Sequence, residues 1–169
     1  MIVLNIADNL FITSPMAIGQ GDNMADAGVV FSHTFDEGLG SSHNSAPFTV
    51  LVDGSGGTDG GFEVWLRAQD ATGKAFTFEM PSPVWFDALV LDQASTIGTM
   101  TLRVQGSMDG VTWTTISNDI AQNTNEIVRW ENNSSDPWVW VRLHCPSGNS
   151  TNPRLNSIYF EGARRAGGQ

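Results

Sequence analysis

Apolar and polar residues alternate through much of the chain after Val29, which is the period of strands with one buried face. Every second position is apolar in residues 99–105, and the same is true of residues 139–145. This alternation predicts two strands, the second with Trp138 and Trp140 on the face opposite the apolar one. Shorter apolar segments predict further strands at Val29–Phe35, Phe48–Val52, Ala75–Met80, Trp85–Leu91, Val111–Ile116, Glu126–Trp130 and Ser157–Glu161.

The segments between these strands are rich in Gly, Ser, Asn and Pro, the residues that form turns and loops. A single helical turn at residues 22–27 is the only helix that the pattern suggests. Many short strands with no intervening helices predict an all-β fold, an antiparallel β-sandwich with little or no helix. We expect one sandwich domain over residues 29–162.

The two ends of the chain lie outside this domain. Ile2, Leu4 and Ile6 alternate with other residues at the N-terminus. Residues 1–28 are therefore expected to form an extra strand that closes the sandwich, or an arm that adds a strand to a neighbouring subunit. Residues 163–169 are expected to form a flexible C-terminal tail.

Composition narrows the class of protein. The chain has 169 residues, of which 15% are charged, and a formal net charge of −10. No apolar run reaches the roughly 20 residues that span a bilayer, and the acidic balance argues against binding nucleic acid. The first 66 residues contain eight acidic residues and no Lys or Arg. This acidic half is a solvated surface, or it docks against a basic neighbour or helps to hold a hard cation.

Four short motifs in order resemble those of discoidin, or coagulation factor V/VIII type C, domains. Residues 102–113 contain Ser107-Met108-Asp109-Gly110-Val111-Thr112-Trp113, which is similar to the family's "S-x-D-G-x-x-W" hairpin. The other three motifs, in chain order, are Leu51-Val52-Asp53-Gly54 followed by Trp65, then Trp140-Val141-Arg142-Leu143, and the closing stretch Leu155–Gly162.

The resemblance covers about Ala46–Gly162 and implies a galactose-binding-like jelly roll. Domains of this kind are non-catalytic, and loops at one end of the sandwich bind glycans, lipids or proteins. In the hairpin, Asp109 and Gly110 are expected to form the turn, and Trp113 is expected to anchor it in the core.

The loop that follows Asp53 carries oxygen donors suited to a hard cation. Family members often hold a structural Ca²⁺ near this loop, so the resemblance implies Asp53, Thr58 and Asp59 as metal ligands. A carboxylate from the closing strand is also expected by the resemblance, but this chain has Ser157 there. The alternative is a plain Gly-rich loop without calcium.

Polar residues near Trp65 are the candidates for ligand binding. Glycan-binding relatives use a His, basic residues and a neighbouring acid in comparable loops, where charged donors recognise sugar hydroxyls. The spacing of the Arg and the Asp departs from the fucose-binding pattern, so no sugar is implied. A solvated hairpin loop is the alternative. The candidates are His43, Arg67, Gln69, Asp70 and Lys74.

No catalytic constellation stands out. The three histidines are scattered, no metal-ligand or nucleophile motif occurs, and the single cysteine cannot make an internal disulfide. His33 lies within a predicted strand and is expected to be structural. We therefore expect no enzyme activity and no cofactor beyond the possible calcium ion.

These observations predict a non-catalytic recognition or attachment module. The N-terminus does not read as a secretory signal, because it lacks a positively charged segment. A bacteriophage virion protein of the head or tail fits this, exposed on the virion surface after lysis and bound to host glycans, neighbouring virion proteins or copies of itself. The alternatives are an accessory carbohydrate-binding module of a larger secreted enzyme and a cement subunit without a glycan ligand.

Overall fold

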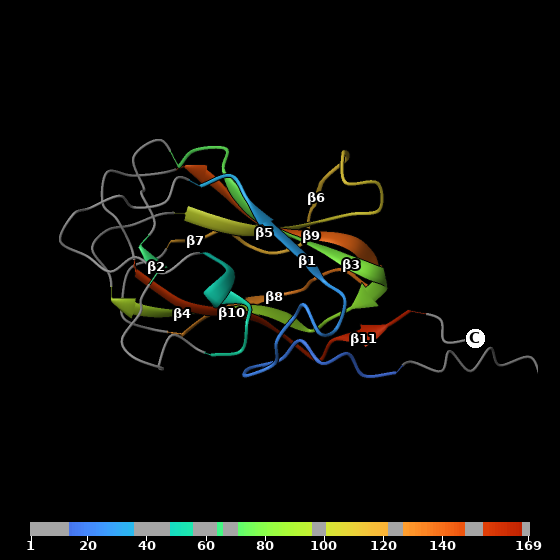
Figure 1. Ribbon diagram of the computed structural model, residues 1–169. Helices are drawn as coiled ribbons and strands as arrows, with labels where there is room; N and C mark the ends of the chain where they lie inside the picture. The colour runs from blue at the N-terminus through green and yellow to red at the C-terminus, as the bar shows by residue number, and fades with distance from the viewer. Residues whose placement is uncertain are drawn as a thin grey trace, which may run out of the picture.

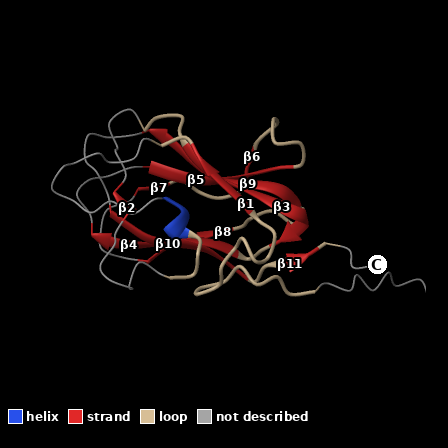
Figure 2. Cartoon of the chain, viewed as in Figure 1, coloured by secondary structure: helices blue, strands red, loops and turns tan. Residues whose placement is uncertain are grey.

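The chain forms two antiparallel β-sheets that enclose an apolar core (Figure 1). The computed structural model describes residues 14–35, 48–55, 64–65, 71–95, 101–121, 127–147 and 154–166. Within these residues, strand is the dominant structure and one short 3-10 helix is present (Figure 2). The predicted antiparallel β-sandwich is therefore confirmed. In the described part of the chain, no helix has the length and apolar character to cross a bilayer.

The larger sheet has the order β1-β3-β9-β5-β6, with β11 paired to β3 and β7 paired to β5. Its strands are β1 (Val30–His33), β3 (Ala75–Trp85), β5 (Thr101–Ser107), β6 (Thr114–Thr115), β7 (Ile120–Ala121), β9 (Trp138–Ser147) and β11 (Arg164–Arg165). The smaller sheet has the order β2-β10-β4-β8. Its strands are β2 (Val64–Trp65), β4 (Ala88–Ser95), β8 (Ile127–Glu131) and β10 (Arg154–Glu161).

The core lies between the inner faces of the two sheets, as the alternation predicts. Phe78 of β3 meets Phe160 of β10 edge-on across this core, with ring centroids 5.2 Å apart. Trp130 of β8 also crosses it, because its indole N–H donates a hydrogen bond to the carbonyl of Leu102 in β5 at 3.2 Å. Aromatic rings in offset or edge-on contact thus join sheets that the sequence pattern describes only one strand at a time.

Three predicted strands differ from the structure. The predicted strand Trp85–Leu91 spans the last residue of β3, two residues between the strands and the start of β4. Phe48–Leu51 forms the 3-10 helix η1, not a strand, because Phe48 and Leu51 both face the core and three residues make one 3-10 turn. The predicted strand Val111–Ile116 is reduced to β6, and Val111 is 81% exposed.

Strand β3 continues through Pro81 and Pro83, whereas the strand predicted from the sequence ended before them at Met80. Its pairing with β9 slips there, since Glu79 pairs with Trp140 and Val84 pairs with Trp138. Four residues of β3 therefore stand opposite one residue of β9. Proline is tolerated in a sheet at such irregularities, because no ladder hydrogen bond is required of it.

The same irregularity separates the two tryptophans of β9. Trp138 belongs to the buried core, whereas Trp140 is half-buried and pairs with Glu79 on the outer face. The prediction that both lie on one face is therefore wrong, because strict alternation does not continue through the slipped pairing. Trp138 packs into the core instead.

The two predicted terminal segments contact each other. Within residues 14–28, Met16, Ile18 and Met24 are buried in the core. The backbone N–H of Met16 donates to the carbonyl of Ala163, and that of Arg165 donates to the carbonyl of Ser14. Within the predicted tail, Arg164 and Arg165 form β11 and pair with β3, and the carbonyl of Ala163 and the N–H of Arg165 bond to this N-terminal segment. Residues 1–13, including the predicted extra strand, lie outside the described residues.

The hairpin between β5 and β6 contains the Ser107–Trp113 motif and stands off the outer side of the larger sheet (Figure 1). The carboxylate of Asp109 accepts hydrogen bonds from the backbone N–H groups of Val111 and Thr112 at 2.8 and 2.7 Å. Gly110 has a φ of +72°, which confirms the predicted turn. Trp113 is only partly buried and is absent from the core, so the predicted core anchor is wrong.

These hydrogen bonds make Asp109 a source of pH-dependent stability. Backbone donors at Thr112 and Val111, with the hydroxyls of Ser107 and Thr112, hold the pKa of Asp109 well below its ordinary value. A carboxyl whose pKa is lowered by folding stabilises the protein above its unfolded pKa of about 3.9, and this contribution is lost as pH falls toward the folded pKa. We expect Asp109→Asn to be less stable than wild type at pH 7, with the difference shrinking below about pH 4. Urea denaturation between pH 2.5 and 7 checks this, and a difference independent of pH contradicts it.

Candidate functional site

Lys74 lies at one end of the sandwich, immediately before β3 begins. Its carbonyl accepts a hydrogen bond from the N–H of Cys145 at 2.9 Å, so the backbone of Lys74 is held against the C-terminal end of β9. The side chain of Lys74 is partly exposed. His43, Arg67, Gln69 and Asp70 lie outside the described residues. Of the predicted ligand-binding residues, the structure therefore places Lys74, and the predicted cluster stays a prediction.

The strand pairings determine which strand ends lie near Lys74. Ala75 pairs with His144, and Thr101 pairs with Ser147, so β3, β5 and β9 share this end of the larger sheet. In the smaller sheet, Arg154 pairs with both Trp65 and Ser95. The described residues that flank the predicted ligand-binding segments therefore gather at one end of the sandwich, on the left of Figure 2.

The core beneath this end is aromatic. The His33 ring lies 4.2 Å from that of Phe48, and its Nδ1 lies 3.1 Å from the carbonyl oxygen of Phe35. Phe35 and Phe48 both pack on Phe76 of β3. His33 is thus held by a ring contact and a hydrogen bond, which confirms its predicted structural role.

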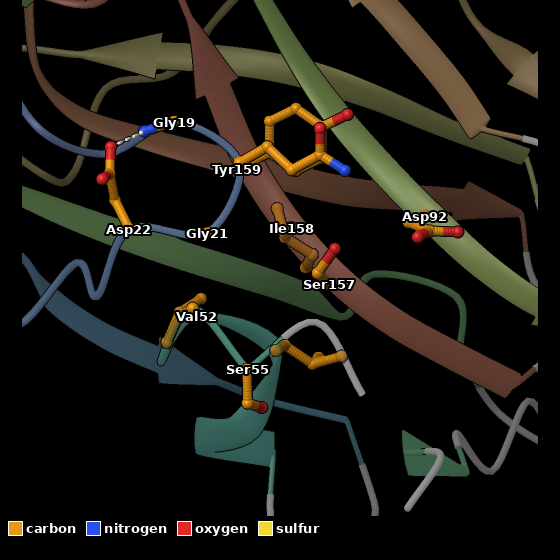
Figure 3. A pocket seen from close by; sticks show the side chains of 12 residues that line it. Gly19, Gly21, Asp22, Val52, Ser55, Asp92, Ser157, Ile158 and Tyr159 are labelled. Atoms are coloured by element: carbon orange, nitrogen blue, oxygen red, sulfur yellow. Dashed lines mark hydrogen bonds between the residues drawn. The ribbon is translucent and has the colours of Figure 1, made fainter. Parts of the chain in front are cut away.

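A cavity of about 230 Å³ lies where four segments of the chain meet (Figure 3). Its wall includes Asp22 from the N-terminal segment, Ser55 after η1, Asp92 of β4, and Ser157 and Tyr159 of β10. The carboxylate of Asp22 accepts a hydrogen bond from the N–H of Gly19 at 2.8 Å, the dashed line in Figure 3. Burial, together with the charges of Glu161 and Asp92, raises the pKa of Tyr159 above its ordinary value. The cavity is thus polar, acidic and small.

A close backbone contact shapes this cavity. Gly54 has a φ of +82°, and a Cβ built on it lies 2.6 Å from the carbonyl oxygen of Gly21. Only glycine allows the loop after η1 to approach the N-terminal segment so closely. The N–H of Met24 donates to the carbonyl of Val52 at 3.0 Å beside it. The "L-x-D-G" motif therefore positions a loop against residues 19–24.

Of the calcium ligands that the sequence resemblance implies, the structure describes Asp53 alone, so the calcium site stays a prediction. The Asp53 carboxylate is exposed and accepts a hydrogen bond from the N–H of Ser55 at 2.8 Å, and Asp53 is not part of the cavity wall. Thr58 and Asp59 lie outside the described residues. Across the described ranges, no three His, Cys, Asp or Glu side chains gather where they could hold a metal ion. Calcium sites use six to eight oxygen ligands with several carboxylates, and Asp53 has no such neighbours in the described part.

From this donor set we expect calcium to leave thermal stability unchanged. A site filled at a hundred times its dissociation constant adds about 2.7 kcal/mol to stability and raises the melting temperature by several degrees. We expect melting temperatures in 5 mM calcium and in chelator to agree within about 1 °C. A rise of several degrees with calcium but not magnesium, abolished by Asp53→Asn, contradicts this expectation and supports the calcium site.

The structure also brings together residues that the sequence analysis did not connect. Arg142 of β9 lies over the ring of Trp113, with its guanidinium carbon 4.1 Å from the ring centroid. Its Nε donates a hydrogen bond to the side-chain oxygen of Gln105 in β5 at 2.8 Å. Arg142 and Gln105 are in register on the outer face, so the alternation placed each correctly. Their contact with Trp113 depends on how the hairpin folds back, which no local pattern records.

By sequence, no protein-family model and no curated protein matches the chain. By structure, it is similar to an F5/8 type C domain from Bacteroides fragilis, with 11% identity and a TM-score of 0.60, covering 90% of this chain and 99% of the other. It is also similar to the C-terminal domain of a chitobiase from Bacteroides fragilis, with 17% identity, a TM-score of 0.60 and coverages of 79% and 92%.

A third similar structure is the family 32 carbohydrate-binding module of NanJ from Clostridium perfringens, in complex with galactose. It shares 9% identity with this chain at a TM-score of 0.56, covering 78% of this chain and 92% of the module. At such low identity, these matches establish the fold. The chain has the discoidin-like β-sandwich fold, and the resemblance drawn from its four motifs is confirmed at that level.

Proposed function

We propose that this protein is a non-catalytic carbohydrate-recognition module, whose ligand site lies at the end of the sandwich that carries Lys74. The observation that carries the proposal is the fold shared with carbohydrate-binding modules, including one in complex with galactose. A rigid sandwich that gathers its loops at one end is a common way to present a binding site. Among the candidate residues from the sequence, Lys74 lies at that end, and His43 and Arg67 stay predictions.

The nucleophiles and bases of the described residues support a binding role over catalysis. Cys145 is fully buried, and burial raises the pKa of its thiol to about 11, so it is protonated at neutral pH. The ring of His33 is packed on Phe48. His144 lies on the outer face of the larger sheet, where it pairs in register with Arg103.

A glycan array with the recombinant protein tests this proposal. We expect selective binding to a small set of neutral glycans that carry terminal hexoses, with affinities measured by titration calorimetry. Lys74→Ala, His43→Ala and Arg67→Ala are each expected to weaken that binding about tenfold, because each removes a charged or polar donor to a sugar hydroxyl. Arg129→Gln, on the smaller sheet and far from this end, is the matched control and is expected to bind as wild type does.

Two results overturn the proposal. One is an array without signal from protein whose melting curve shows it to be folded. The other is glycan binding that all three loop-end variants leave unchanged, which moves the site elsewhere on the molecule. The setting in a bacteriophage particle stays a prediction from the sequence, and co-purification of the protein with particles is its test.

A further inference from the structure

Arg142 is held in a fixed orientation on the outer face of the larger sheet. One face of its guanidinium lies on the Trp113 ring, and its Nε is bound by Gln105, whose amide in turn donates to the hydroxyl of Thr115 at 3.1 Å. The residue is partly buried, and desolvation lowers its pKa. The two terminal amino groups of Arg142 have no hydrogen-bond partner among the described residues. They form the free end of a planar fork that binds a carboxylate through two parallel hydrogen bonds.

Three of the described arginines are paired with carboxylates, whereas the exposed Arg165 and the partly buried Arg142 have no such pair in the described part. Arg103 pairs with Asp119, Arg129 with Glu131 and Glu161, and Arg164 with Asp87. Arg142 has no carboxylate partner in the described part of the chain. The terminal amino groups of Arg142 are thus held in one orientation without an internal anion, so an anionic ligand can pair with them at little cost in side-chain entropy.

The side chains next to Arg142 on the same face are a histidine and a second arginine. His144 follows it on β9 and pairs in register with Arg103 of β5. Desolvation is the largest cause that lowers the pKa of His144, and the charges of Arg142 and Arg103 lower it further. The charge of Asp119 acts in the opposite direction. The Nε of Arg103 and the Nδ1 of His144 are buried atoms without a partner in the described structure. Buried polar atoms without partners often mark a place where a water or an ion binds.

An aromatic surface lies on the other side of Arg142. Trp140 precedes it by two residues on the same face of β9, so the two side chains start about 7 Å apart. Gly110 of the hairpin lies against the indole, since a Cβ there is 3.1 Å from its ring. Glu79 pairs in register with Trp140 and is the carboxylate on this side. Aromatic rings stack on sugar rings, and carboxylates accept hydrogen bonds from sugar hydroxyls.

We propose that the outer face of the larger sheet binds an acidic sugar, with the ring of a hexuronate on Trp140 and its carboxylate on the terminal amino groups of Arg142. This site lies on the outer face of the larger sheet beside the β5–β6 hairpin (Figure 1), and it reaches toward the end that carries Lys74, because His144 pairs with Ala75. Glu79 accepts hydroxyls of the same sugar, while the charge of Arg142 favours the carboxylate. The ligand class is thus a uronate-containing glycan, distinguished from neutral sugars by its charge and from sulfated sugars by the planar carboxylate that matches the fork.

Titration calorimetry with trigalacturonate tests the proposal, with neutral galactotriose and a sulfated galactotriose as matched probes. We expect wild type to bind trigalacturonate more tightly than either. Arg142→Gln and Trp140→Ala are each expected to lower that affinity about tenfold or more, since charge-assisted hydrogen bonds and ring stacking each contribute on this scale. Arg142→Lys is expected to lie between, because it keeps the charge and loses the fork. Arg129→Gln removes the same charge from the other sheet and is expected to change affinity less than twofold.

A second measurement on wild type shows which tryptophans the ligand contacts, without relying on variants that could alter folding. On adding trigalacturonate to wild type, the indole N–H resonances of Trp113 and Trp140 are expected to shift, and that of Trp130 is expected to stay in place. Three results overturn the proposal: folded wild type that binds no uronate at millimolar concentration, equal losses in Arg142→Gln and Arg129→Gln, or indole signals that do not respond. Tighter binding of the sulfated probe overturns the assignment to a carboxylate.

The two sites fail independently. Neutral-glycan binding that depends on Lys74 and survives Arg142→Gln supports the loop-end site and leaves the outer face to the uronate data. Uronate binding that depends on Arg142 and survives Lys74→Ala supports the outer face even when no neutral glycan binds.

Discussion

Replacing Trp130 by alanine is expected to lower the free energy of unfolding by about 3 to 5 kcal/mol, the usual cost of removing a large buried aromatic side chain. Trp130 is 1% exposed and is among the largest fully buried side chains. It joins the two sheets, since it extends from β8 and donates its indole N–H to the carbonyl of Leu102 in β5. The substitution leaves a cavity in the core and deprives that carbonyl of its donor. Urea denaturation monitored by circular dichroism measures the effect.

Two matched variants separate the contributions. Trp130→Phe keeps an aromatic ring and loses the N–H donor, so we expect about half the loss. Trp85 is only partly buried and donates its N–H to the carbonyl of Ser135. Trp85→Ala is therefore expected to cost clearly less than Trp130→Ala. Equal losses at the two tryptophans contradict the view that Trp130 couples the sheets.

Replacing Gly106 by alanine is expected to cost about 3 kcal/mol, because the added methyl group overpacks a filled core. Gly106 lies in β5 opposite Val141, and a Cβ there overlaps the indole of Trp138. The indole is held in the core, so neither β5 nor the ring has space to move. The midpoints of urea denaturation of Gly106→Ala and wild type measure this difference.

Gly73 provides the control for this prediction. Its φ is +83°, but nothing lies within 4 Å of an added Cβ, so Gly73→Ala carries backbone strain without a clash. We expect it to cost about 1 kcal/mol. In a Trp138→Leu background the penalty of Gly106→Ala is expected to shrink, because the overlapping ring is gone. A penalty that is the same in both backgrounds shows that Trp138 is not the cause.

The strands were predictable where a single face is buried. The alternation in residues 99–105 and 139–145 matches β5 and β9 closely. The prediction failed at Phe48–Leu51, because two core residues three apart suit a 3-10 turn as well as a strand. The sequence predicted the turn at Asp109 correctly and wrongly assigned Trp113 to the core, while Lys74 as a ligand-binding residue stays a prediction. It did not connect Trp113 with Arg142, since the contact arises from a hairpin folding over a neighbouring strand.

The sequence by itself determined the class of fold, the positions of most strands along the chain and the turn residues. Period-two alternation and glycine or aspartate turns are local properties of the chain. The tertiary structure alone decided which residues meet. The slipped pairing of β3 with β9 sends Trp138 inward and Trp140 outward. Register across three strands leaves Arg142 without a carboxylate, while Arg103 receives one. Such contacts join residues far apart in the chain, and they depend on strand register and irregularities that no local pattern encodes.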